Sequence, residues 1–235
     1  MPDQDKNTSP GLGPGALLRR LALGLAIAVA LFFVPAGRLD WWAGWRFLAL
    51  FFAASLGLYA WLRRRDPGLV AERQQAGPGV ERWDRVLMGL YTILLLTLPI
   101  VAGLDAARFG WSAPSLGVQI LGWLLLVAGL AIVAWTMAAN TYLSERVRIQ
   151  EDRGHRVVTG GPYRYVRHPM YVGVILALLG APLALASLWA LIPGAACALL
   201  FVVRTALEDR TLREKLPGYR AYAGRVRYRL LPGVW

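Results

Sequence analysis

The chain has 235 residues, of which 57% are hydrophobic, and it carries 26 lysines and arginines against 14 acidic residues. Its apolar content is higher than a soluble globular domain requires, so the composition indicates a membrane protein. The charge of +12 does not indicate nucleic-acid binding, because the basic residues flank apolar segments and no nucleic-acid-binding module is present. The single cysteine, Cys197, excludes a disulfide framework or a thiolate metal site within one chain.

The order of polar and apolar segments predicts an all-α, polytopic transmembrane bundle. Residues 1–15 are polar and then rich in glycine and proline, which is typical of a disordered tail. Four apolar segments follow, each near the roughly 20 residues that cross a bilayer: 17–35, 41–62, 86–104 and 116–139. The fifth, 170–203, is too long for one span and contains Pro182 and Pro193, so it predicts a helical hairpin that turns near residues 181–188. The total is about six spans.

The distribution of cationic residues predicts the orientation in the membrane. An even number of spans places both termini on one side, and only Arg38, Arg46 and Arg108 of the 26 cationic residues fall on the other. The positive-inside rule then predicts cytoplasmic N- and C-termini. The bias toward Arg, Ala, Leu and Gly is typical of bacterial proteins, so we expect a bacterial inner membrane. Trp41, Trp42, Trp45 and Trp111 lie at predicted span ends, where we expect them to anchor the protein at the headgroup level.

Three regions follow from this topology. They are the tail 1–15, four transmembrane helices within 16–139, and residues 140–235, which contain a cytoplasmic connector, the hairpin and a C-terminal segment. The charged loop 63–85 suits a connector with a short interfacial helix. The basic, aromatic segment 219–229 is predicted to be helical in its first part and to lie on the membrane as packing or as a lid.

The segment 160–173 concentrates polar side chains at the predicted start of a helix. Pro169 suits the first helical position, which makes His168 the N-cap and leaves nearby backbone N–H groups without intrahelical partners. Together with Arg167 these donors predict a site for a carboxylate or phosphate. His168 and Tyr171 are three residues apart, so both can face the same cleft near the helix start. Alternatively, His168 only caps the helix and Arg167 only reaches toward lipid headgroups. Two histidines without a cysteine cluster or an HExxH motif predict no metal site.

A second polar cluster follows the last span. Arg204 and Glu208 are four residues apart on one predicted helix face, with Asp209 offset by about 100°. They form either a surface ion pair or a site in which Glu208 contacts a cofactor and Arg204 neutralises an anionic substrate. A tight hairpin would bring these three residues to Arg167, His168 and Tyr171.

Several motifs in the last hundred residues resemble the isoprenylcysteine carboxyl methyltransferases and related phospholipid methyltransferases. They are Gly161-Pro162-Tyr163-Arg164, Arg167-His168-Pro169-Met170-Tyr171-Val172-Gly173, Arg204 with Glu208-Asp209, and Tyr219-Arg220-Ala221-Tyr222. The chain departs from the usual pattern in having Asp209 as the second of two acidic residues, and Leu216-Pro217-Gly218-Tyr219 in place of a Phe-Gly pair. These departures bear on the substrate class.

The resemblance implies an integral-membrane methyltransferase that uses S-adenosylmethionine without a Rossmann domain. It assigns Tyr163, Arg167, His168, Tyr171, Glu208 and Asp209 to the cofactor region, and Arg204 with Glu208 to the reacting end. The expected acceptor is a lipophilic or membrane-associated molecule, either an isoprenylcysteine-like carboxylate or a phospholipid-like amine. A carboxylate is already ionised at neutral pH and needs only orientation by Arg204, whereas an amine would need Glu208 as a base.

Two other functional classes remain open. The Arg-His-Pro motif followed by tyrosine also occurs in membrane sterol and steroid reductases, so an NADPH-dependent reductase is one alternative. A non-catalytic membrane or transport protein is another, and ionisable residues buried within a span would favour it. No such residue lies well inside a predicted span.

Overall fold

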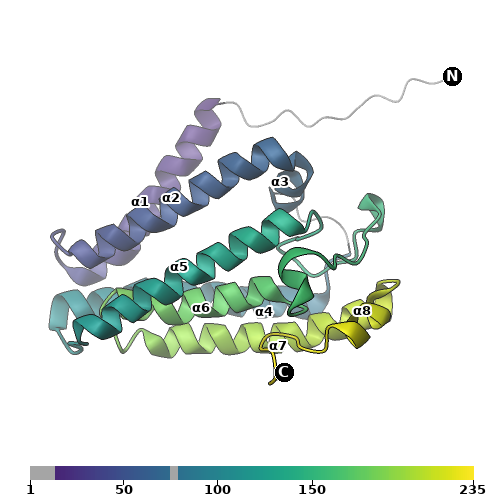
Figure 1. Cartoon of the computed structure of the whole chain (residues 1–235). Coiled ribbons are helices and arrows are strands. Elements are labelled where there is room, and N and C mark those ends of the chain that lie inside the picture. Colours follow the sequence, from purple (N-terminus) through teal and green to yellow (C-terminus); the bar gives the residue numbers. More distant parts are fainter. Residues whose placement is uncertain (1–13, 75–78) are drawn as a thin grey trace.

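The computed structural model describes residues 14–74 and 79–235. The predicted disordered tail lies outside these residues, except that Pro14 and Gly15 begin the first helix. Within the described part the fold is helical and contains no strand. The longer helices are α1 (Pro14–Ala36), α2 (Trp42–Arg65), α4 (Arg82–Ala102), α5 (Leu116–Ala139), α6 (Pro169–Ala184) and α7 (Leu191–Lys215). The short helices α3 (Pro67–Gln74) and α8 (Tyr219–Arg225) lie near one end of the bundle, beside the connector between α5 and α6 (Figure 1).

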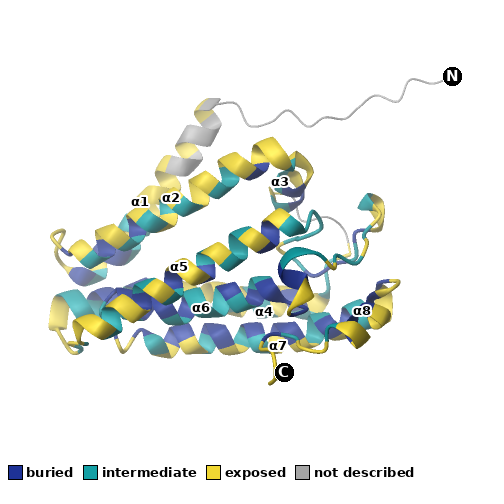
Figure 2. Cartoon of the chain, in the orientation of Figure 1, coloured by how far each residue is buried: buried dark blue, intermediate teal, exposed yellow. Residues whose placement is uncertain are grey.

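Four helical segments are long and apolar enough to cross a membrane. They are Trp42–Arg65, Arg82–Phe109, Leu116–Ala139 and Leu191–Lys215. The apolar segments Ala22–Ala36 and Pro169–Ala184 are shorter, so a count of six spans stays a prediction. Buried residues gather where α4, α5, α6 and α7 pack together, while many of the described side chains of α1 and α2 are exposed (Figure 2). The exposed apolar surface of these helices suits contact with lipid.

Helices α5 and α6 approach each other backbone to backbone. Gly122 and Gly129 on α5 face Gly180 and Gly173 on α6, each pair of glycines seven residues apart on its own helix. A methyl group added at Gly129 would lie 2.4 Å from the carbonyl oxygen of Gly173, and one added at Gly180 would lie 2.7 Å from that of Gly122. Only glycine permits this spacing, which is a common way of packing helices inside a membrane.

The helix that begins with α4 is longer than the sequence predicts. The expected span 86–104 continues as a π-helix, Gly103–Phe109, and ends at Gly110 in the left-handed conformation. Asp105 is therefore enclosed by the helix bundle and fully buried. Its carboxylate accepts hydrogen bonds from the hydroxyls of Ser112 (2.8 Å) and Ser187 (2.6 Å), which join this helix end to the turn after α6.

The chain reverses direction between α6 and α7 over residues 185–190. Helix α6 extends to Ala184, with Pro182 inside its last turn, and Ala186 adopts a left-handed conformation with φ of 61°. Pro193 does not interrupt α7, because it is the third residue of that helix and the first N–H groups of a helix have no intrahelical partner. Helices α6 and α7 pack against each other, which brings the start of α6 close to the final turns of α7.

One predicted interface anchor is wrong. Trp41 is only 8% exposed and packs against Phe32 and Phe33 of α1, with ring centroids about 6 Å apart. Its ring therefore joins α1 to α2, because the turn between these helices folds it inward. By contrast, Trp42 and Trp111 are exposed, as an interface position requires.

Candidate active site

A pocket lies at the end of the bundle where α6 begins and α7 ends. Its walls are formed by the connector that follows α5, the start of α6, the last turns of α7, and α8. It contains about 770 Å³ of empty space, a volume that includes the open solvent at its mouth. Six of the seven residues predicted from sequence line it, and the seventh, Asp209, lies behind its wall.

The start of α6 has the predicted geometry. Pro169 is the first helical residue and His168 is the N-cap, although the imidazole of His168 makes no capping hydrogen bond. The ring instead stacks on Tyr171 with nearly parallel planes, 5.8 Å between centroids. Its Nε2 atom lies 3.4 Å from the hydroxyl of Tyr219 and 3.5 Å from Asp209. His168 is thus part of the pocket wall and not merely a cap.

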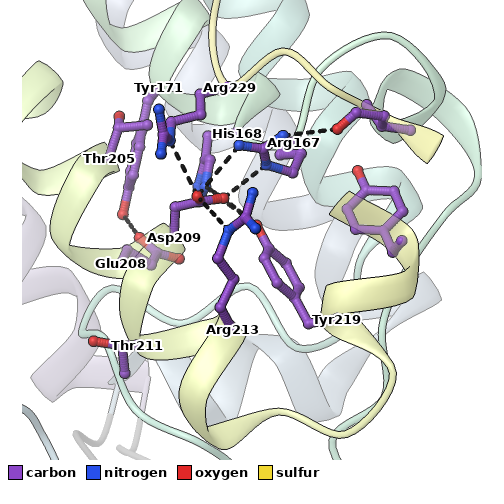
Figure 3. Close-up of polar contacts among 12 residues, drawn as sticks. Arg167, His168, Tyr171, Thr205, Glu208, Asp209, Thr211, Arg213, Tyr219 and Arg229 are labelled. Atoms are coloured by element: carbon purple, nitrogen blue, oxygen red, sulfur yellow. Dashed lines mark hydrogen bonds and ion pairs between the residues drawn. The ribbon is translucent and has the colours of Figure 1, made fainter. Parts of the chain in front are cut away.

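Asp209 is the centre of a buried ionic cluster (Figure 3). Its fully buried carboxylate accepts hydrogen bonds from Arg167 (2.7 Å), Arg213 (3.0 Å), Arg229 (3.0 Å) and the hydroxyl of Tyr219 (2.9 Å). Such a buried carboxylate requires several partners, because each lost hydration contact must be replaced. Asp209 therefore ties α7 to the start of α6, to α8 and to the C-terminal segment.

The guanidinium of Arg167 is hydrogen-bonded to other groups of the protein. Besides its two bonds to Asp209, its Nη1 atom donates to the carbonyl oxygens of Val226 (2.8 Å) and Arg227 (2.6 Å). The backbone N–H groups of Arg167 and His168 donate to the carbonyls of Tyr228 and Arg229. These contacts hold the C-terminal segment against the pocket wall, so the geometry gives Arg167 a positioning role.

Glu208 and Arg204 lie on the pocket side of α7. Glu208 is partly exposed and accepts a hydrogen bond from the hydroxyl of Tyr171. Arg204 is 4% exposed, and its guanidinium lies over the Tyr171 ring, 5.3 Å from the centroid. Within the described part of the chain Arg204 forms no ion pair with Glu208, contrary to the surface-pair alternative. It pairs instead with Asp84 at the start of α4, 2.8 Å away.

The connector between α5 and α6 is fixed by buried charges from the N-terminal half. Arg148, which lines the pocket, forms a two-pronged ion pair with Glu72 of α3, with N–O distances of 2.7 and 2.9 Å. The Arg148 guanidinium lowers the pKa of the Glu72 carboxyl. Farther along, His155 stacks on Tyr142, and burial together with the charges of Arg148 and Arg153 lowers the pKa of His155 to about 4. His155 is therefore neutral at physiological pH.

Three buried tyrosines complete the pocket. Tyr163 accepts a hydrogen bond from the side chain of Asn140 (2.7 Å), and its carbonyl accepts one from the hydroxyl of Tyr222 (2.8 Å). Burial raises the pKa of Tyr163 and of Tyr222, and burial with the nearby charge of Asp209 raises the pKa of Tyr219. All three hydroxyls thus stay protonated at physiological pH and offer neutral polar groups on aromatic rings.

The structure brings the predicted residues together and adds others. Tyr163, Arg167, His168, Tyr171, Arg204 and Glu208 line the pocket, whereas Asp209 lies behind its wall. No local sequence signal marks Asp84, Glu72, Asn140 or Arg148, and the two acidic residues pair with arginines far away in the chain. Tyr219 and Tyr222, predicted as packing or lid, pack in a buried cluster with Tyr163 and line the pocket from α8. A role as a lid stays a prediction.

The chain was compared with protein families and with curated proteins. Residues 114–214 match the model of the isoprenylcysteine carboxyl methyltransferase (ICMT) family, a range that includes Tyr163, Arg167, His168, Tyr171, Arg204, Glu208 and Asp209. The comparison with curated proteins gives no match. The matched range contains most of the pocket, and the helices α2, α4, α5 and α7 are those of an integral membrane protein. Residues 114–214, which form most of the pocket, are therefore similar to the isoprenylcysteine carboxyl methyltransferase family.

Proposed function

We propose that this protein transfers a methyl group from S-adenosylmethionine to a lipophilic acceptor at the cytoplasmic face of a membrane. The observation that carries this proposal is the pairing of Glu208 with Tyr171 beside Arg204, in one pocket at the end of a membrane bundle. An anionic and a cationic group thus lie within reach of one another at a surface where lipids and polar cofactors meet.

The pocket residues fit the chemical groups of S-adenosylmethionine. Tyrosine rings offer flat surfaces for adenine, and Asn140 and Glu208 offer acceptors for hydroxyl or ammonium groups. Arg146 and Arg156 line the pocket, and within the described part of the chain their side chains form no ion pair. They can therefore receive the cofactor's carboxylate, in place of Arg167, whose donors are already used.

The bound cofactor would supply an electrophilic methyl group on a sulfonium. The protein's own residues then have two tasks, which are to align the acceptor and to exclude water. Arg204 orients a carboxylate acceptor by a charge-assisted hydrogen bond, and Glu208, held by Tyr171, receives the positively charged or hydroxyl part of the cofactor. For an amine acceptor Glu208 would take up the proton. Asp209 and Arg167 keep the C-terminal segment in place over these groups.

Ligand-dependent stability tests the proposal directly. The purified protein in detergent is titrated separately with S-adenosylmethionine, S-adenosylhomocysteine and NADPH while its unfolding temperature is followed. We expect saturable stabilisation by both adenosyl ligands, amounting to about 2.7 kcal/mol at a hundredfold excess over Kd. Stabilisation by NADPH alone would overturn the proposal in favour of a reductase.

The acceptor class is tested next by methyl transfer from labelled S-adenosylmethionine. The candidates are an S-prenylated cysteine with a free carboxyl group, phosphatidylethanolamine, and a long-chain thiol. We expect transfer to the prenylcysteine carboxylate, because arginines dominate the charged lining of the pocket and Glu208 is its one lining carboxylate within the described residues. Transfer to the amine alone would assign Glu208 the role of base.

A further inference from the structure

Asp84 at the start of α4 connects the N-terminal half of the chain to the pocket. It lies outside residues 114–214, yet its carboxylate is fully buried and both of its oxygens are used. One accepts a hydrogen bond from Nε of Arg204 on α7 (2.8 Å), and the other accepts one from the backbone N–H of Val147 in the connector (3.0 Å). A single carboxylate thus joins three separate segments.

The same contacts determine how Arg204 is presented. Its Nε atom is held by Asp84, and its Nη2 atom donates to the carbonyl oxygen of Glu145 (2.8 Å). Within the described part of the chain Nη1 forms no hydrogen bond, while the residue lines the pocket. A planar guanidinium held at two nitrogens has a fixed orientation, so its remaining donors are directed before any ligand arrives.

Asp84 also fixes the pocket wall opposite α7. Both backbone polar groups of the connector residue Val147 are hydrogen-bonded. Its N–H donates to Asp84, and its carbonyl accepts from the N–H of Glu81 (3.1 Å). Arg73 of α3 holds the preceding part of the connector through the carbonyl oxygen of Leu143 (3.2 Å). The wall that faces Arg204 is therefore held by the segments that precede and begin α4.

We infer that Asp84 is a positioning residue for recognition of an anionic acceptor, which it serves by aligning the guanidinium of Arg204. This inference rests on the proposed function and deepens it, because it names the residue that aligns Arg204 for a carboxylate acceptor. Asp84 bonds only to Nε of Arg204. The Nη1 atom therefore keeps its capacity to donate a hydrogen bond to a second carboxylate.

Equilibrium binding to two matched acceptors tests this role without requiring turnover. The probes are an S-farnesylated N-acetylcysteine with a free carboxylate and the same molecule as its neutral primary amide. For Asp84→Asn we expect roughly tenfold weaker binding of the carboxylate, and less than twofold change for the amide and for S-adenosylhomocysteine. Asp40→Asn is the matched control, since Asp40 also pairs with an arginine, Arg38, but is exposed and far from the pocket.

The double variant Asp84→Asn/Arg204→Gln separates positioning from general damage. If Asp84 acts through Arg204, the double variant binds the carboxylate as weakly as Arg204→Gln alone. Equal weakening of both acceptors by Asp84→Asn, or no weakening of either, would overturn the inference. Should Asp84→Asn fail to fold, Asp84→Glu keeps the charge but displaces it by one methylene, and the loss must again be confined to the carboxylate acceptor. A wild-type protein that binds S-adenosylhomocysteine but neither acceptor would reject the inference while leaving methyl transfer intact.

Discussion

At the scale of single residues, the pocket is built from a few charged groups with different tasks. Glu208 is partly exposed and faces the pocket, whereas its neighbour Asp209 is fully buried among arginines. Two adjacent acidic residues therefore occupy opposite environments, because consecutive residues on a helix point about 100° apart. This separation supports the proposal that Glu208 takes part in the chemistry, while the contacts of Asp209 give it a structural role.

Replacing Glu208 by glutamine tests its charge with little change in volume. We expect methyl transfer to fall by about 10- to 100-fold, because a hydrogen bond to a charged group contributes about 1.5–3 kcal/mol. Steady-state kinetics and the Kd of S-adenosylhomocysteine measure the effect. Glu214→Gln is the control on the same helix, because Glu214 is an exposed partner of Arg210 and its loss leaves the pocket unchanged. Unaltered turnover and cofactor affinity in Glu208→Gln would remove the role given to that carboxylate.

His155 makes the stability of the connector depend on pH. Its pKa is about 4 in the folded protein against about 6.5 when unfolded, so between these values the unfolded chain binds a proton that the folded chain does not. Stability is therefore lost as the pH falls from about 6.5 to 4. Since His155 is partly exposed, we expect a loss of about 1–2 kcal/mol. Unfolding of wild type and His155→Asn at pH 7 and pH 4.5 measures it, and an equal acid sensitivity of the two proteins would contradict this account.

At the scale of elements, the position of α6 depends on its glycine contact with α5. This contact places the start of α6, and with it Pro169, beside the end of α5 and the Asn140–Tyr163 pair. The helix pair is thus both a membrane structure and the support of the pocket.

Gly129→Ala tests this support. The added methyl group would meet the Gly173 carbonyl at 2.4 Å, and backbone atoms inside a helix cannot move aside locally. We expect a destabilisation of about 1–3 kcal/mol and weaker binding of S-adenosylhomocysteine. Gly89→Ala on α4 is the matched control, because its methyl group would meet no atom within 4 Å, and there we expect unchanged or slightly higher stability. Thermal unfolding in detergent compares the two, and similar behaviour would show that α5 and α6 can separate without cost.

At the scale of the whole molecule, the pocket and most basic residues lie at one end of the bundle. The positive-inside rule predicts that this end faces the cytoplasm. With the proposed function, a soluble cofactor would reach the pocket from there and a lipophilic acceptor from the bilayer. The apolar surface of the helices then faces lipid on all sides.

Cysteine labelling tests this orientation. Cys197 is fully buried, so the wild-type background is low. Leu39 is 69% exposed between α1 and α2, and Arg225 is exposed at the end of α8. We expect a membrane-impermeant maleimide to label Leu39→Cys in intact spheroplasts, which lack the outer membrane barrier. Arg225→Cys should be labelled only after the spheroplasts are lysed. The reverse pattern would invert the topology.

The sequence by itself determined the membrane class, the positions of the longer helices and the residues that surround the start of α6. Hydrophobic segment length and the position of Pro169 are local properties, so they can be read without knowing the fold. The sequence did not determine the π-helical extension around Asp105 or the inward packing of Trp41, since both depend on contacts with distant helices. Only the tertiary structure decided that Asp84 and Glu72 hold Arg204 and Arg148. These ion pairs join residues 120 and 76 positions apart, and their partners are chosen by helix packing and by the need to compensate every buried charge.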